Sequence, residues 1–197
     1  MTWKSTLAAG LALLVLAGGL AAPAKADDLD QAFKEAKKAA EARDAAASLK
    51  ALRQATALIW ERLPFSVLEV HLLAAPPAGY GQFLPRVDNQ YRQSEPMILY
   101  MEPVGFKVRF DPKDGTYTYN LTADFNLVDA WGRVVGGRRD FGRFGGQAQQ
   151  FPDRNPMSFT YSLSGLPPGD YRVETTLRDV LGGKSHTVVT PFKIVGP

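Results

Sequence analysis

The segment Tyr117-Thr-Tyr-Asn-Leu-Thr-Ala-Asp-Phe-Asn-Leu127 decides the fold class, because apolar and polar side chains alternate along its whole length. Successive side chains of a β-strand point to opposite faces of a sheet. One face of this segment carries Tyr, Leu, Ala and Phe side chains, and the other carries Thr, Asn and Asp. The pattern predicts a strand over residues 117–127 with one face in a hydrophobic core and the other in water.

Other segments on the C-terminal side of Pro64 show strand signals too. Residues 158–163 and 171–178 alternate in the same way, and we predict that they bury Phe159, Tyr161, Leu163, Tyr171, Val173, Thr175 and Leu177. Further strands are predicted over residues 66–73, 97–102, 104–110 and 186–195. Because clusters of Gly, Pro, Asn and Asp separate these segments, we predict an antiparallel β-sandwich of about seven strands over residues 64–197.

The end of the chain adds a resemblance to a known architecture. Residues 166–195 contain a Pro-Pro-Gly turn, a Tyr-x-Val strand, the turn Asp179-Val-Leu-Gly-Gly-Lys184 and an alternating last strand. This order resembles the closing hairpin of immunoglobulin-like and fibronectin-III-like sandwiches in exported bacterial proteins. The resemblance implies an Ig-like sandwich without the cysteine pair and core tryptophan of antibody domains. It implies no activity, because these families share an architecture and not a function.

A helical segment precedes the predicted strands. Residues 28–62 contain no Pro or Gly and much Ala, three aspartates lie at the start, and Pro64 ends the pattern. One helix of this length would extend about 50 Å, whereas a break near Arg43-Asp44 would give an antiparallel hairpin, which we favour. We therefore predict an α+β protein in which residues 27–63 form a helical segment beside the sandwich.

The N-terminus has the features of a secretory signal peptide. Lys4 precedes an apolar run over residues 7–22, and Ala24-Lys25-Ala26 fits the small-residue cleavage pattern. We predict that residues 1–26 are a signal peptide, with cleavage after Ala26 and export to the periplasm of a Gram-negative cell. An uncleaved membrane anchor is the alternative. No membrane span is expected after cleavage.

Charge and cysteine content exclude other classes of protein. Removal of residues 1–26 takes away two lysines and no acid, which leaves 21 basic and 20 acidic residues. A nucleic-acid partner is therefore not expected, because such proteins carry a clustered basic surface. The chain has no cysteine, so neither a lipidated cysteine nor a disulfide is available, and stability must come from a packed core.

The stretch 131–146 is our first candidate for an interaction surface. It combines glycines with arginines and two phenylalanines: Arg133, Arg138, Arg139, Phe141, Arg143 and Phe144. Arginines beside aromatic rings bind carboxylates, phosphates and other planar groups. The alternative is a Gly-rich hairpin whose arginines form a solvated face. The spacing of a phosphate-binding P-loop is absent.

The second candidate is the irregular loop 76–91, which contains Tyr80, Phe83 and Tyr91. Long loops on a rigid scaffold often carry binding residues. These rings could stack on sugars, which would make the protein a carbohydrate- or peptidoglycan-binding module. Alternatively they close one end of the sandwich or cover the helical segment.

Residues for catalysis or metal binding are scarce. The chain has two histidines, His71 and His186, and Met97, Met101 and Met157 are candidates for copper ligands, but no clustered motif joins them. No nucleophile elbow, zinc helix or cofactor motif is present. We therefore predict a non-enzymatic exported protein without cofactor that binds an envelope protein or a cell-wall ligand, with a copper carrier or an enzyme as weaker alternatives.

Overall fold

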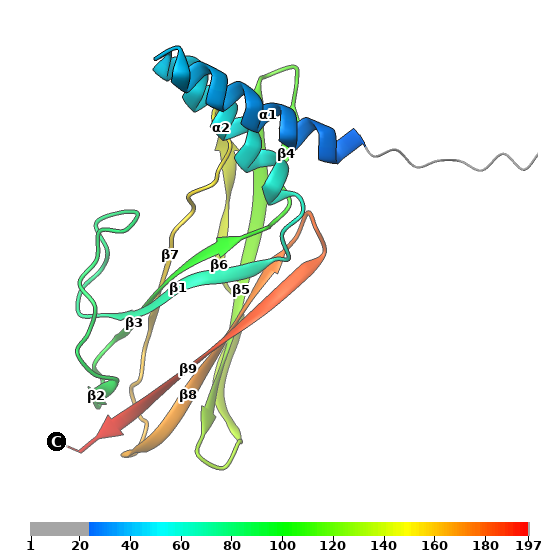
Figure 1. Ribbon diagram of the computed structural model, residues 1–197. Coiled ribbons are helices and arrows are strands. Elements are labelled where there is room, and N and C mark those ends of the chain that lie inside the picture. Colours follow the sequence, from blue (N-terminus) through cyan, green and yellow to red (C-terminus); the bar gives the residue numbers. More distant parts are fainter. Residues whose placement is uncertain (1–23, 197) are drawn as a thin grey trace, which may run out of the picture.

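The computed structural model describes residues 24–196, which form two helices followed by strands (Figure 1). The predicted signal peptide, residues 1–26, lies almost entirely outside the described residues. Helix α1 (Ala24–Glu41) and helix α2 (Ala45–Trp60) form an antiparallel hairpin. Asp44 caps α2 by accepting a hydrogen bond from the Ala47 N–H at 2.9 Å. The favoured break near Arg43-Asp44 is therefore confirmed. In the described part of the chain, no helix has the length and hydropathy needed to cross a membrane.

The strands form two sheets, so the described chain is α+β as predicted. The three-stranded sheet has the order β1-β3-β7, with β1 (Ser66–Leu73), β3 (Met97–Val104) and β7 (Met157–Tyr161). The second sheet contains β2 (Gln90–Arg92), β9 (Lys184–Val195), β8 (Gly169–Asp179), β5 (Thr116–Asp129), β4 (Arg109–Asp111) and β6 (Val134–Ala148). All paired strands are antiparallel except β2, which runs parallel to β9.

A hydrophobic core lies between the two sheets. The small sheet contributes Met97, Leu99, Met101, Met157, Phe159 and Tyr161, and the large sheet contributes Leu121, Ala123, Leu127, Val173, Leu177, Phe192 and Ile194. The alternation predicted for residues 158–163 and 171–178 is confirmed, because every second side chain is buried or half-buried on the core side. Even the buried Thr175 is satisfied, since its hydroxyl bonds the Tyr161 hydroxyl at 2.7 Å.

Three strands differ from the sequence prediction. The prediction of a strand over residues 104–110 is wrong, because β3 ends at Val104 and the next strand is the short β4 (Arg109–Asp111). Gly105 interrupts the segment with φ +71°, and a Cβ at this position would lie 2.3 Å from the Pro64 carbonyl oxygen. Strand β2 was not predicted, and β6 was considered only as part of a Gly-rich hairpin over residues 131–146.

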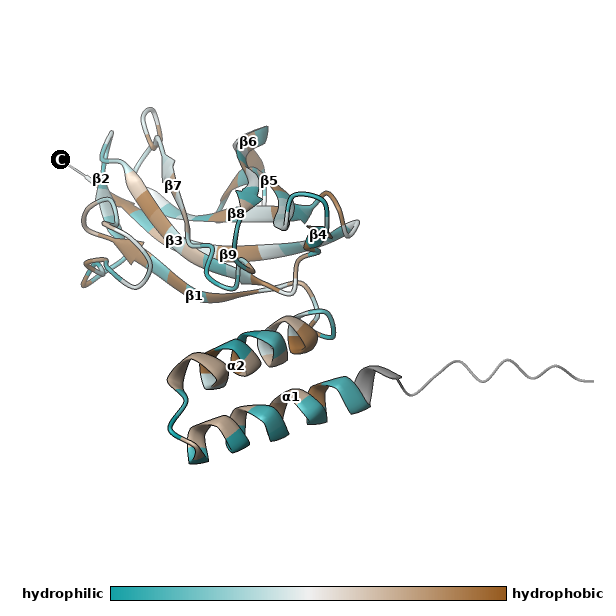
Figure 2. Cartoon of the chain, turned by 90° about the horizontal axis from the view of Figure 1, so that it is seen from above, coloured by the Kyte–Doolittle hydropathy of each residue, from teal (hydrophilic) through white to brown (hydrophobic). Residues whose placement is uncertain are grey.

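Trp60 is a main contact between the helical hairpin and the β-structure. Trp60, at the end of α2, is 6% exposed, and its indole N–H donates a hydrogen bond to the Phe106 carbonyl at 2.9 Å. The Trp60 ring meets the edges or faces of Phe106 and Phe151 at centroid distances of 5.1 and 5.7 Å. Figure 2 shows α2 between α1 and the strands, so α1 packs on α2 and the hairpin projects from one end of the β-structure.

Candidate interaction site

The Arg-rich segment 131–146 forms the tip of the β5–β6 hairpin and most of strand β6. Strand β6 is 15 residues long and, in the described part of the chain, pairs with β5 alone. It is therefore an edge strand of the large sheet. An edge strand presents a row of backbone N–H and C=O groups to which another strand can bond.

The four arginines of this segment have different surroundings. Arg133 pairs with Asp129 at 2.7 Å, and Arg143 pairs with Asp140 at 3.2 Å. Arg138 and Arg139 are exposed and make no ion pair within 4.0 Å in the described chain. These two guanidinium groups on the edge strand are therefore available to an anionic partner.

Arg138 and Arg139 border a hollow of about 410 Å³ on the outer face of the large sheet. Asp124 lies in it and accepts hydrogen bonds from the Asp140 N–H at 2.9 Å and from the Arg178 side chain at 2.7 Å. The Asp140 N–H, and then Arg178, hold the pKa of the Asp124 carboxyl below its ordinary value. Asp124 is therefore ionised and already bonded, which leaves the hollow an excess of positive charge at its β6 side.

The two phenylalanines proposed for this surface point into the core instead. Phe141 stacks on Tyr161 at a centroid distance of 5.4 Å and meets Phe125 at 4.7 Å. Phe144 packs edge-on against Phe159 at 5.1 Å. The structure therefore corrects the prediction for Phe141 and Phe144, which hold β6 against the small sheet. Of the predicted residues in this segment, the arginines form the surface.

The loop 76–91 also divides into buried and exposed rings. Tyr91 is fully buried and packs against Phe192 in the core, with the Arg86 guanidinium 4.3 Å from its ring centroid. Burial raises the pKa of Tyr91 to about 12. Its proposed role in ligand contact is therefore corrected to a core role.

The other two loop aromatics lie on the outer side of the small sheet. Phe83 packs between His71 and Tyr100 at centroid distances of 4.8 and 4.5 Å, so it covers the sheet and neither closes the end of the body nor reaches the helices. Tyr80 is 46% exposed, with the Arg154 guanidinium 5.3 Å from its ring. The loop therefore offers one accessible aromatic ring, that of Tyr80.

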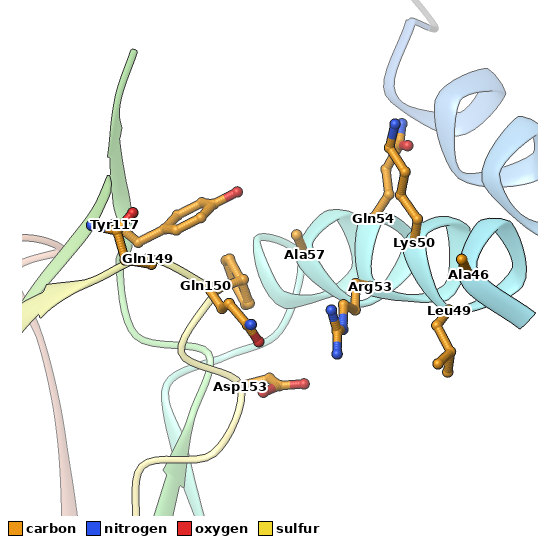
Figure 3. A pocket seen from close by; sticks show the side chains of 11 residues that line it. Ala46, Leu49, Lys50, Arg53, Gln54, Ala57, Tyr117, Gln149, Gln150 and Asp153 are labelled. Atoms are coloured by element: carbon orange, nitrogen blue, oxygen red, sulfur yellow. The ribbon is translucent and has the colours of Figure 1, made fainter. Parts of the chain in front are cut away.

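A hollow of about 620 Å³ was not predicted from the sequence (Figure 3). It separates the side of α2 that carries Leu49, Lys50 and Arg53 from the segment 149–153. Figure 3 shows Arg53 pointing across the hollow toward Gln150 and Asp153. Its walls are exposed charged, amide and apolar groups, which could contact a polar chain but supply no recognisable catalytic set.

Residues considered for metal binding lie apart or inside the core. Met97, Met101 and Met157 are almost fully buried between the sheets. His71 contacts Glu69 at 2.8 Å, and His186 lies in β9. Within residues 24–196, no group of three His, Cys, Asp or Glu side chains is placed to hold a metal ion. The three methionines considered as copper ligands are therefore core residues.

Comparisons with known proteins give distant structural similarities only. No family model matches the chain, and no curated protein matches it in sequence. A Niemann-Pick type C2 protein from the Japanese carpenter ant is similar with a TM-score of 0.41 and 12% identity, over 66% of this chain and 92% of that one. The DNA glycosylase AlkC of Pseudomonas fluorescens, solved with DNA containing an abasic-site analogue, has a TM-score of 0.38 and 12% identity, over 75% of this chain and 36% of that one. Scores this low indicate no function for this chain.

Proposed function

We propose that this chain is an exported, non-enzymatic binding protein of the periplasm, and that its immunoglobulin-like β-sandwich binds an envelope protein along the free edge of β6. Residues 1–26 would direct export and be removed after Ala26. The observation that carries the proposal is the combination of a long edge strand, which pairs with β5 alone, and two exposed arginines without an ion pair in the described chain, Arg138 and Arg139.

The geometry of the edge favours an extended partner segment. A strand added to β6 would satisfy the free backbone groups of the edge, and these bonds would supply affinity without regard to sequence. Arg138 and Arg139 would select segments with acidic side chains, because an unpaired guanidinium binds carboxylate through charge-assisted hydrogen bonds. The same charges discourage pairing between the β6 edges of two copies of the protein. The edge is therefore open to an acidic segment but not to a second copy of itself.

The test is capture of envelope proteins by the exported form, checked by mass spectrometry to begin at Asp27. The double variant Arg138→Ala/Arg139→Ala is expected to recover about tenfold less of a specific partner, while its free energy of unfolding changes by less than about 1 kcal/mol, as for exposed substitutions. The matched control is Arg109→Ala/Lys113→Ala, which removes two exposed positive charges near the β4–β5 turn.

Hydrogen exchange distinguishes edge pairing from general charge attraction. Binding of the captured partner is expected to slow amide exchange in β6 and to leave β8, in the middle of the sheet, unchanged. Equal capture by the two double variants would contradict the proposal. So would recovery of glycan or metal with no protein.

A further inference from the structure

Trp131 is the most exposed aromatic side chain in the described part of the chain. It lies in the turn between β5 and β6, and 80% of its surface is exposed. Figure 1 shows this turn at the end of the β-structure away from the helices. An indole ring in water leaves a large apolar surface unburied. An exposed apolar group on a well-ordered turn is a candidate contact for a ligand.

Several hydrogen bonds hold the backbone of the turn that carries this ring. The Asp129 carboxylate accepts hydrogen bonds from the backbone N–H groups of Trp131 at 3.0 Å and Arg133 at 2.9 Å, and from the Arg133 Nε at 2.7 Å. Gly132 supplies the positive φ of +82° that the turn requires. The Arg133 guanidinium carbon lies 5.0 Å from the Trp131 ring centroid. A turn held in this way loses little backbone entropy on binding.

Trp131 and the segment 165–171 line a pocket of about 360 Å³. Pro167 and Pro168 form its apolar surface, and the Tyr171 hydroxyl anchors this segment by donating to the Pro167 carbonyl at 2.9 Å. Three charged side chains line the pocket: the buried Asp129, which is paired with Arg133, and the exposed Arg133 and Asp170, whose side chains are 70% and 75% exposed. The pocket therefore combines a flat aromatic face, a proline wall and polar groups of both charges.

We propose that this pocket binds one pyranose ring of a glycan. A pyranose presents C–H groups on its faces and hydroxyls around its edge, so a ring face can stack on the indole of Trp131 while hydroxyls donate to Asp170 and accept from Arg133. The volume is at the lower end of the range for small-molecule sites, which suits one or two sugar rings. A lipid chain would leave the charged rim unsatisfied.

The test is a titration of the isotope-labelled protein with three soluble oligosaccharides: chitotetraose, cellotetraose and maltotetraose. The Trp131 indole N–H resonance, identified by its loss in Trp131→Phe, is expected to shift saturably with at least one of them at millimolar concentration. Trp131→Ala is expected to weaken that binding by about tenfold or more, and Trp131→Phe less, because it keeps an aromatic face. Val180→Ala, at an exposed apolar position in the β8–β9 turn, is the control and should bind like the unchanged protein.

Three results would overturn the proposal. They are no saturable shift with any of the three oligosaccharides, equal binding by Trp131→Ala in a protein of unchanged thermal stability, and a response of the resonance to phosphatidylglycerol vesicles only. The double variant Arg138→Ala/Arg139→Ala should retain sugar binding, so failure at this pocket and failure at the β6 edge are distinguishable.

Discussion

The helical hairpin (residues 24–60) and the β body (residues 65–196) bury different kinds of side chain. Apart from Trp60 at the end of α2, the two helices bury small residues, namely Ala32, Ala36, Ala51 and Ala55, and leave Phe33, Leu49 and Leu52 about half exposed. The β body buries Tyr91, Phe106, Tyr161 and Phe192 almost completely. Full burial of a large apolar side chain contributes about 1.5–3 kcal/mol, several times what a methyl group contributes.

This difference shows that a sequence with a clear helical pattern need not form a part of the protein that is stable by itself. The body has a core of its own, whereas the hairpin depends on close contacts between alanines and on Trp60 at the junction. We therefore expect the hairpin to open locally at a lower free energy than the body. The predictions below test this contrast, from the largest expected effect to the smallest.

The first prediction compares one substitution in both regions. Leu99→Ala, at a fully buried position of β3, should lower the free energy of unfolding by about 2–5 kcal/mol, because it leaves a cavity in the core. Leu52→Ala, at a position of α2 that is 46% exposed, should cost less than about 1 kcal/mol. Denaturant unfolding of both variants measures the contrast, and equal losses would show that the two regions share one cooperative core.

The second prediction concerns the junction. Trp60→Phe keeps an aromatic ring but removes the N–H that bonds the Phe106 carbonyl, so it should cost about 1 kcal/mol or somewhat more. Amide exchange should become faster throughout α1 and α2 and stay unchanged in β5. Phe151→Leu, which removes a ring partner of Trp60 while leaving this hydrogen bond in place, is the control. Faster exchange in β5 as well would contradict an independent hairpin.

The third prediction is a pH effect confined to the body. The Asp140 N–H and Arg178 lower the pKa of Asp124 in the folded state. The Asp124 carboxylate therefore binds a proton more readily in the unfolded chain than in the folded one. The resulting stabilisation is present above the ordinary carboxyl pKa of about 4 and is lost as the pH falls through the lower folded-state value. Asp124→Asn should therefore show a smaller loss of stability between pH 5 and acid than the unchanged protein. Parallel pH profiles would show that Asp124 contributes nothing.

Local sequence patterns predicted the elements that depend on neighbours along the chain. Alternation identified strand β5, and the absence of Pro and Gly together with Asp44 identified the two helices. Strand β6 was harder to predict, because its glycines and arginines break the alternation of polar and apolar residues. Its position is set by pairing with β5. The inward direction of Phe141 and the burial of Tyr91 depend on partners far away in sequence, so no local pattern could reveal them.

The candidate sites were predictable only in part. Arg138 and Arg139 are exposed as expected, but we did not distinguish them from Arg133 and Arg143, which pair with the nearby Asp129 and Asp140 in the folded chain. The hollow beside α2 and the pocket beside Trp131 each lie between segments that folding brings together.

The contrast between Trp60 and Trp131 also has an optical consequence. Trp60 is 6% exposed at the helical junction, and Trp131 is 80% exposed at the far end of the β body. An indole in a core fluoresces at shorter wavelength than one in water and is shielded from aqueous quenchers. Each of these two tryptophans therefore reports on one end of the molecule, so that detachment of the helices and occupation of the distal pocket would give separate spectral signals without any added label.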